Sequence, residues 1–141
     1  MIVDNLIRLN EEVKDKFAAI ELAGQLLVDN GNVSEEYIKS MHERDQNVSV
    51  YMGNMIAIPH GTDAGRESVL KTGISIIQIP EGVDFAGNEV KMVFGIAAKG
   101  DEHMDIISNI AILCSEEENV QKLIKITDKK EMAKVIANGE F

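Results

Sequence analysis

The stretch Met92-Val93-Phe94-Gly95-Ile96-Ala97-Ala98 decides the fold class of this chain. It is apolar at nearly every position and contains no charged side chain. Such a run predicts a β-strand covered on both faces, because a strand with one solvated face alternates between apolar and polar residues. A sheet that contains this strand needs other layers packed against it, and this requirement indicates an α/β arrangement.

Three other segments predict strands. Residues 55–58 are short and apolar, and residues 6–9 form a short possible strand. Residues 73–79 alternate between the two faces and are expected to stop at Pro80, which has no N–H to donate. Residues 81–90 are expected to form a turn or a short hairpin-like excursion between the two longer strands.

Apolar residues spaced three and four apart predict a helix over residues 15–30. The face expected to be buried consists of Phe17, Ile20, Gly24, Leu27 and Val28. Ser34 is placed to cap a second helix. The helical pattern fades after Arg44 into a polar loop, residues 45–49.

The C-terminal third predicts further helices, beginning with residues 103–114. Two capping-box patterns follow, Ser115 with Glu118 and Asp128 with Glu131. Because these helices and the earlier ones alternate with strands, the chain predicts an α/β fold with a central mixed β-sheet flanked by helices on both faces.

Length and composition suit a single domain spanning residues 1–141. The chain has 24 acidic and 14 basic residues and a formal net charge of −10. This charge argues against nucleic-acid binding and serves either solubility alone or steering toward a basic partner. No apolar run approaches the roughly 20 residues of a membrane span. The single cysteine, Cys114, is expected to be buried, and the absence of an internal disulfide indicates a reducing, cytoplasmic setting.

His60 has the most informative setting of the three histidines. It follows an apolar strand and Pro59, which ends sheet pairing, and Gly61 allows a ligand to approach the backbone closely. Ligands of open α/β sheets bind beyond the carboxyl ends of strands, where His60 would lie if its strand is parallel to its neighbours. Since neutral imidazole is a good nucleophile, a functional His60 and an inconsequential loop histidine are both open at this point.

The other polar candidates have weaker settings. His103 begins a helix after a glycine-containing loop, where backbone N–H groups attract anions, although Asp101 and Glu102 would repel one. Arg44 could clamp an anion if it reaches the His60 loop. His42 reads as a solvated surface residue.

A metal site is not indicated. His60, Asp63 and His103 could in principle gather around a catalytic metal, and a metal hydrolase is therefore one alternative function. Their spacing matches no strong ligand pattern, and a single cysteine cannot form a structural zinc cluster. No cofactor or metal is predicted.

The segment Met55-Ile56-Ala57-Ile58-Pro59-His60-Gly61-Thr62 resembles the phosphorylation-site motif of enzyme IIA proteins of the bacterial phosphotransferase system, in the mannitol–fructose family. Stretches similar to the mannitol branch accompany it, namely residues 51–53, 69–73, 80–83 and 95–98, with Glu102-His103 after the last. The resemblance runs from the first strand to the final helix. It implies a mixed sheet flanked by helices and a phosphocarrier function.

The resemblance also implies partners and roles. In the family, the motif histidine, matched here by His60, accepts a phosphoryl group on Nε2 from the phosphocarrier protein HPr. It then passes the group to a cysteine on the IIB domain of the mannitol permease, whose IIC component spans the membrane. A second histidine and an arginine support the site, and they match His103 and Arg44. The protein would be cytoplasmic, associating with the permease without inserting into the membrane.

Three more residues are expected at the phosphoryl group. N–H groups around Gly61 and Thr62 would help to stabilise its charge. Asn54 stands where mannitol-type relatives can carry a glutamate, and it could orient the arginine only through a weaker neutral hydrogen bond. Two alternatives within the family are a regulatory, nitrogen-type IIA phosphoprotein that controls partner proteins and a fructose-specific IIA.

Overall fold

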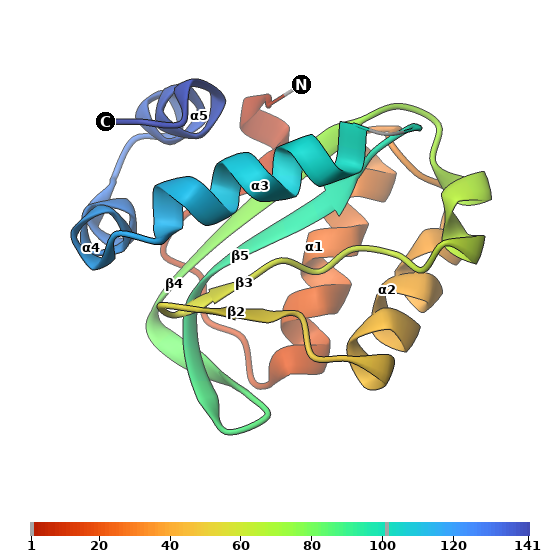
Figure 1. Ribbon diagram of the computed structural model, residues 1–141, viewed down its shortest axis with the longest axis horizontal. Coiled ribbons are helices and arrows are strands. Elements are labelled where there is room, and N and C mark those ends of the chain that lie inside the picture. The colour runs from red at the N-terminus through yellow and green to blue at the C-terminus, as the bar shows by residue number, and fades with distance from the viewer. Residues whose placement is uncertain (1, 101) are drawn as a thin grey trace.

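The computed structural model describes residues 2–100 and 102–141, and the side chains of Glu102 and His103 lie outside the described part. Within these residues the strands are β1 (Ile7–Arg8), β2 (Tyr51–Gly53), β3 (Ile56–Ala57), β4 (Gly73–Phe85) and β5 (Asn88–Ala97). They form one sheet in the order β1-β4-β5-β3-β2 (Figure 1). The pairs β1–β4 and β3–β5 are parallel, and β4–β5 and β2–β3 are antiparallel. The prediction of a mixed sheet is therefore confirmed.

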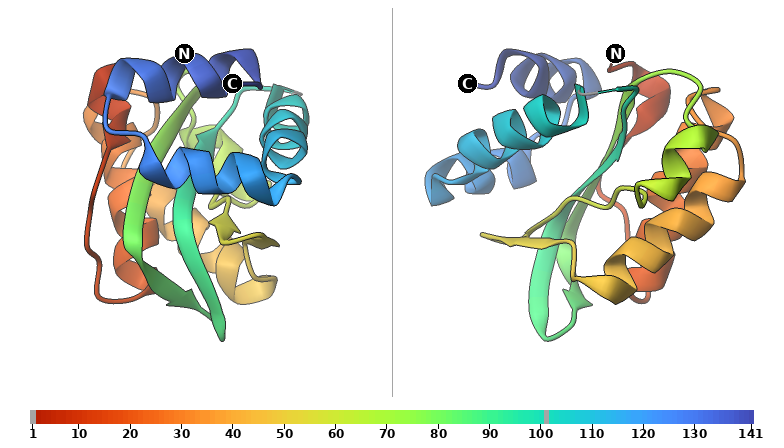
Figure 2. Two further views of the ribbon diagram at one scale, coloured as in Figure 1. Left: turned by 90° about the vertical axis from the view of Figure 1, so that its left-hand side faces the viewer. Right: turned by 45° about the vertical axis from the view of Figure 1, so that its right-hand side comes forward.

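Helices cover both faces of this sheet, as predicted (Figures 1 and 2). One face carries α1 (Lys16–Asp29) and α2 (Glu36–Asn47). The other carries α3 (Glu102–Cys114), α4 (Glu117–Lys125) and α5 (Lys129–Asn138). Short 3₁₀ turns span Asp4–Leu6 and Ala64–Ser68.

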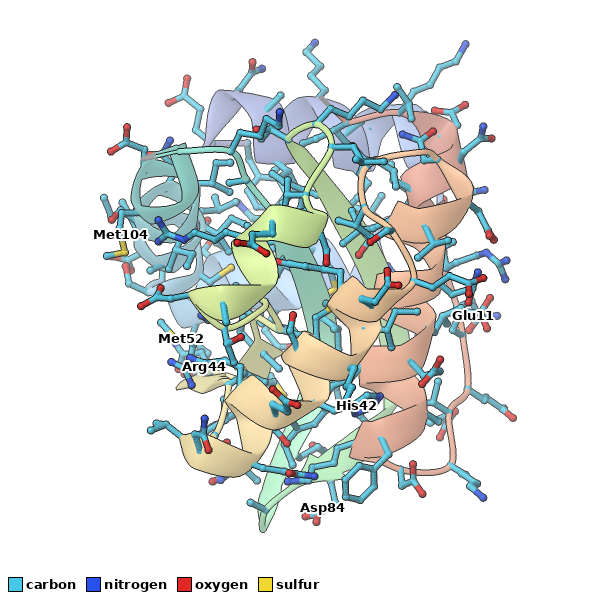
Figure 3. The ribbon with its side chains drawn as sticks, turned by 90° about the vertical axis from the view of Figure 1, so that its right-hand side faces the viewer. Glu11, His42, Arg44, Met52, Asp84 and Met104 are labelled. Atoms are coloured by element: carbon cyan, nitrogen blue, oxygen red, sulfur yellow. The ribbon has the colours of Figure 1, made fainter. Side chains whose placement is uncertain are left out.

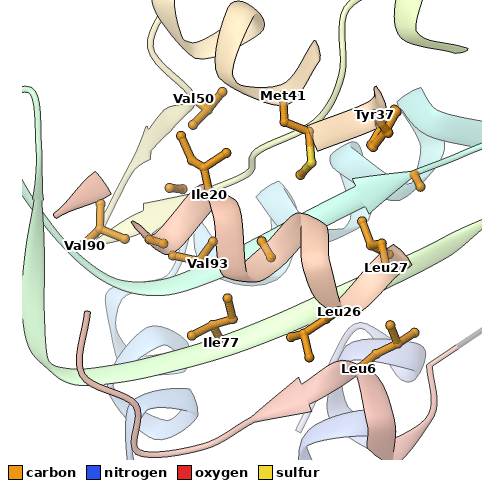
Figure 4. Close-up of a cluster of buried hydrophobic side chains, with 14 of the residues drawn as sticks. Leu6, Ile20, Leu26, Leu27, Tyr37, Met41, Val50, Ile77, Val90 and Val93 are labelled. Carbon is orange, nitrogen blue, oxygen red and sulfur yellow. The ribbon is translucent and has the colours of Figure 1, made fainter. Parts of the chain in front are cut away.

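The central strand β5 supplies side chains to two separate cores. Val93 and Ala97 belong to the cluster beneath α1 and α2, part of which is shown in Figure 4. Phe94 and Ile96 point the other way, into the cluster beneath α3, α4 and α5. All four are fully buried. This alternation with a period of two explains why the stretch is apolar throughout, since neither face is solvated.

Pro80 does not end β4, which was predicted to stop there. The strand continues to Phe85 and turns into β5, so residues 81–90 belong to one long hairpin. The register shifts between Gln78 and Val83, and Pro80 lies inside this irregularity. A proline is tolerated at a bulge because no ladder N–H is needed from it there.

Two predicted details of the helices are wrong. Phe17 is half exposed, because its ring lies outside the core beside α2, 6.3 Å from the ring of His42. Neither Ser34 nor Ser115 caps the following helix, and the cap positions are Glu35 and Glu116. The Asp128 cap is confirmed, since its carboxylate accepts a hydrogen bond from Lys130 N–H. A side chain caps a helix only if its residue takes the backbone conformation of the N-cap position. Local sequence does not set that conformation.

None of the helices within residues 2–100 and 102–141 has the length and apolar character of a transmembrane segment.

At Gly95, α1 packs closely against the sheet. A Cβ atom there would overlap Ser75 Oγ and lie 3.0 Å from Ala23 Cβ. Ser75 Oγ in turn donates a hydrogen bond of 2.9 Å to Ala23 O. We expect Gly95→Ala to lower the free energy of unfolding by about 1–3 kcal/mol, measured by urea denaturation. When Ser75 is also replaced by alanine, Gly95→Ala should lower the free energy of unfolding by less. If the losses from the two single substitutions simply add up in the double variant, this steric account is contradicted.

Candidate functional site

His60 lies at the wall of an open cavity of about 630 Å³. Three segments build the cavity: the end of α2 and the loop into β2, residues 60–63 after β3, and the first turns of α3. The residues that line it are Arg44, Asn47, Val48, Met52, His60, Gly61, Thr62, Asp63, Met104 and Ile107. In Figure 3, Arg44, Met52 and Met104 lie together along one side of the view, apart from His42.

The sheet positions His60. It follows β3, which runs parallel to β5, so it emerges beyond the carboxyl end of β3 as expected. Ile96 N–H donates to Pro59 O at 2.9 Å, and His60 makes a parallel bridge with Ile96. These backbone contacts hold the start of the loop against the central strand.

One hydrogen bond sets the tautomer of the His60 ring. Nδ1 lies 2.8 Å from the carbonyl oxygen of Ile58. A carbonyl oxygen only accepts hydrogen bonds, so Nδ1 must carry the proton and donate it. In the neutral ring the nitrogen with the unprotonated lone pair is then Nε2.

Arg44 reaches the same cavity from the last turn of α2. Its Nη1 donates a hydrogen bond of 2.7 Å to Val48 O at the end of its own helix. The neighbouring Asp45 is buried, forms an ion pair of 2.9 Å with Lys16 and accepts a hydrogen bond from Val50 N–H. These contacts fix the end of α2 and hold the Arg44 guanidinium beside the cavity before any ligand binds.

Gly61 and Thr62 both line the cavity, but the Gly61 N–H is already engaged. It donates a hydrogen bond of 2.9 Å to the hydroxyl oxygen of Tyr37, so in this arrangement it is not directed at a ligand. Thr62 Oγ1 accepts a hydrogen bond of 3.2 Å from Gly65 N–H. A hydroxyl group that accepts one bond can still donate its own proton, so Thr62 retains a donor for the cavity.

Asn54 does not line the His60 cavity, contrary to the expectation from sequence. Its Nδ2 donates to Cys114 O at 2.9 Å and to Ser115 O at 3.2 Å. These carbonyls lie at the C-terminal end of α3, where helix carbonyls lack partners within the helix. Asn54 therefore joins the β2–β3 hairpin to α3, and its amide nitrogen is directed at these carbonyls.

The remaining titratable candidates lie in different settings. The backbone of His103 belongs to the first turn of α3, but its side chain lies outside the described part. His42 Nε2 lies 3.1 Å from Glu21 Oε1 between α1 and α2, away from the cavity. Cys114 is buried as expected, and burial raises the pKa of its thiol to about 12. Among the side chains that the structure describes, no three His, Cys, Asp or Glu residues could hold a metal ion.

Two features of the site were not predicted. Val48, Met52 and Met104 form an exposed apolar rim around the cavity, each with more than half of its surface accessible. Tyr37, by contrast, is buried beneath the loop. An exposed apolar residue in a polar stretch, such as Val48, was the one available sequence signal for the rim.

A parallel strand ending in a histidine of fixed tautomer, with an arginine beside it, is a setting for phosphoryl transfer. Over residues 1–139 the chain matches the family described as phosphoenolpyruvate-dependent sugar phosphotransferase system, EIIA 2, and it belongs to this family. It is a phosphocarrier, an enzyme IIA phosphotransferase component of a sugar phosphotransferase system.

Its relatives include two mannitol-specific phosphotransferase enzyme IIA components. The protein of Bacillus subtilis (strain 168) is 57% identical over 127 residues, which are 89% of this chain and 89% of the relative. That of Geobacillus stearothermophilus is 52% identical over 134 residues, 94% and 92% of the two chains. The structure resembles enzyme IIA-mannitol of Escherichia coli, solved in complex with phosphorylated enzyme IIB-mannitol, with a TM-score of 0.91, 33% identity and 98% of each chain covered.

The hydrogen bonds of Asn54 can be tested by Asn54→Asp. A carboxylate cannot donate to the two carbonyls, and it adds negative charge at the negative end of the α3 dipole. We expect the free energy of unfolding to fall by about 1–2 kcal/mol in urea denaturation. The same change at the exposed Asn109 of α3 is the control and should cost less. An equal loss at both positions would mean that the Asn54 contacts contribute nothing.

Proposed function

We propose that this chain carries a phosphoryl group on Nε2 of His60. The observation that supports this assignment most strongly is the hydrogen bond from Nδ1 to Ile58 O, which leaves Nε2 as the nucleophilic nitrogen. This nitrogen belongs to a residue that lines an open cavity with Arg44 in its wall. The family to which the chain belongs gives the assignment its chemical context.

Phosphoryl transfer would proceed by direct displacement. The Nε2 lone pair forms a bond to phosphorus while the bond between phosphorus and the donor imidazole breaks, and its electron pair returns to the donor ring. The His60 ring then carries positive charge, which the Nδ1–H bond to the Ile58 carbonyl stabilises. Arg44 offsets the negative charge on the phosphoryl oxygens, and Thr62 can donate a hydrogen bond to them. His103, which matches the family's second histidine, is proposed to assist Arg44.

We further propose HPr as the phosphoryl donor and the cysteine of a IIB domain as the acceptor. The structural resemblance to an enzyme IIA that forms a complex with phosphorylated enzyme IIB supports the second partner. The apolar rim of Val48, Met52 and Met104 gives a partner protein a surface to contact around His60. Residues 1–141 act as one IIA domain in the cytoplasm, at the permease and outside the membrane. The match over residues 1–139 supports this domain assignment.

Mannitol is the proposed sugar, because relatives that are 47–57% identical are mannitol-specific components. Since the phosphoryl group and not the sugar binds this chain, specificity resides in which IIB domain it recognises.

Phosphorylation by enzyme I, HPr and phosphoenolpyruvate tests the site. One acid-labile phosphoryl group per chain is expected, and His60→Ala should abolish it because the nucleophile is lost. The matched control is His42→Ala, which removes a histidine paired with Glu21 away from the cavity and should retain full labelling. Labelling that survives in the His60 variant would refute the assignment.

Genetic complementation tests the sugar. In a strain that lacks its mannitol enzyme IIA, this chain should restore growth on mannitol, and the His60→Ala variant should not. Growth on fructose alone, in a strain lacking the fructose component, would replace mannitol by fructose. Failure on both sugars despite phosphorylation of His60 in vitro would favour the regulatory type of IIA protein.

A further inference from the structure

One face of α2 joins the His60 loop to the arginine of the site. Tyr37, Ser40 and Arg44 follow one another at spacings of three and four, so they lie on the same side of the helix. Tyr37 and Ser40 contact the loop after β3, and Arg44 lines the cavity. Helix α2 therefore contacts the His60 loop through Tyr37 and Ser40, and it supplies Arg44 to the cavity.

The Tyr37 hydroxyl group bridges this loop to the central strand. It donates a hydrogen bond of 2.6 Å to Ile96 O and accepts one of 2.9 Å from Gly61 N–H. The residue is only 3% exposed. Burial raises the pKa of the Tyr37 phenol, although the Gly61 hydrogen bond and the charge of Arg66 act in the opposite direction. The phenol consequently keeps its proton at neutral pH and can donate it to the carbonyl.

The backbone on both sides of His60 is thus attached to a single residue of β5. On the N-terminal side, Pro59 O accepts from Ile96 N–H at 2.9 Å. On the C-terminal side, Gly61 N–H reaches Ile96 O through the Tyr37 hydroxyl group. Removal of the Tyr37 hydroxyl oxygen would break this second attachment. The partly buried Gly61 N–H and the buried Ile96 O would then lose this hydrogen-bond partner.

Packing at Gly61 reinforces the attachment. A Cβ atom at this position would lie 2.5 Å from Tyr37 Cε1 and 2.5 Å from Ser40 Oγ. The loop backbone therefore rests directly on the α2 face, with no room for a side chain between them. Ser40 Oγ donates to Tyr37 O at 2.7 Å, which keeps its own side chain turned along the helix.

We propose that Tyr37 is a positioning residue for phosphoryl transfer, which holds His60 in line with Arg44 by joining Gly61 to Ile96. This role rests on the proposed function of His60. In-line displacement is sensitive to small displacements of the nucleophile, since an error of about 1 Å can lower a rate by roughly a hundredfold. Tyr37 acts through the backbone and does not touch the phosphoryl group.

The test is Tyr37→Phe, which removes only the hydroxyl oxygen. Single-turnover transfer from phosphorylated HPr should slow by roughly 10- to 100-fold in its maximal rate, with little change in KM, because the docking surface is untouched. Tyr51→Phe removes the same atom from the other tyrosine of the chain, a partly buried residue of β2, and should transfer at the wild-type rate. Rates are compared well below the unfolding temperature of each variant, so that loss of folded protein does not contribute.

Amide hydrogen exchange provides a second readout in the unphosphorylated protein. Gly61 N–H should be protected in the wild type and should exchange at least about tenfold faster in Tyr37→Phe, while Ile96 N–H remains protected. Gly61→Ala, which keeps the phenol but displaces the loop from it, should show the same loss of maximal rate.

The outcomes separate the two proposals. A Tyr37→Phe protein that transfers at the wild-type rate overturns the positioning role, as does a defect confined to KM. A wild-type chain that accepts no phosphoryl group on His60 overturns the proposed function. It also removes the role of Tyr37 in transfer, regardless of how fast the Gly61 amide exchanges. A slowed maximal rate in Tyr37→Phe beside normal transfer in Tyr51→Phe is the expected result.

Discussion

Burial of β5 on both faces is the constraint on which the rest of the structure depends. Its side chains alternate between two cores, so helices must cover the sheet on each side. Its backbone is equally occupied, because β4 and β3 pair with its two edges. Near its C-terminal end Ile96 also bonds the loop after β3 through both of its peptide groups, directly to Pro59 and through Tyr37 to Gly61. The central strand of the sheet therefore also holds the candidate nucleophile.

The chemistry of the site depends on backbone groups as much as on side chains. The Ile58 carbonyl selects the His60 tautomer, and the Val48 carbonyl holds the Arg44 guanidinium. Neither interaction uses an acidic side chain, and a carboxylate in these positions would repel the phosphoryl group. Neutral backbone acceptors thus position both side chains of the site for an anionic group.

Much of the fold could be predicted because the strands and helices have strong local periodicity. Predictions failed where packing between distant segments overrides a local preference. Pro80 stops a regular ladder, yet the shift in register between β4 and β5 accommodates it. Phe17 fits the periodic face of α1, yet its ring lies half exposed beside His42 of α2. Ser34 and Ser115 have the composition of caps, but the chain enters both helices in a different geometry.

The sequence by itself determined the α/β class, the position of His60 after a strand, and the match of Arg44 to the arginine of the family. Those conclusions rest on residue types and on neighbours within a few positions. Only the tertiary structure decided that Gly61 N–H bonds Tyr37, that Asn54 bonds the end of α3, and that Val48 and Met104 share a rim. Each of these pairs joins residues more than 20 positions apart, which the packing of helices on the sheet brings together. Such pairs leave no periodic signal in a single sequence.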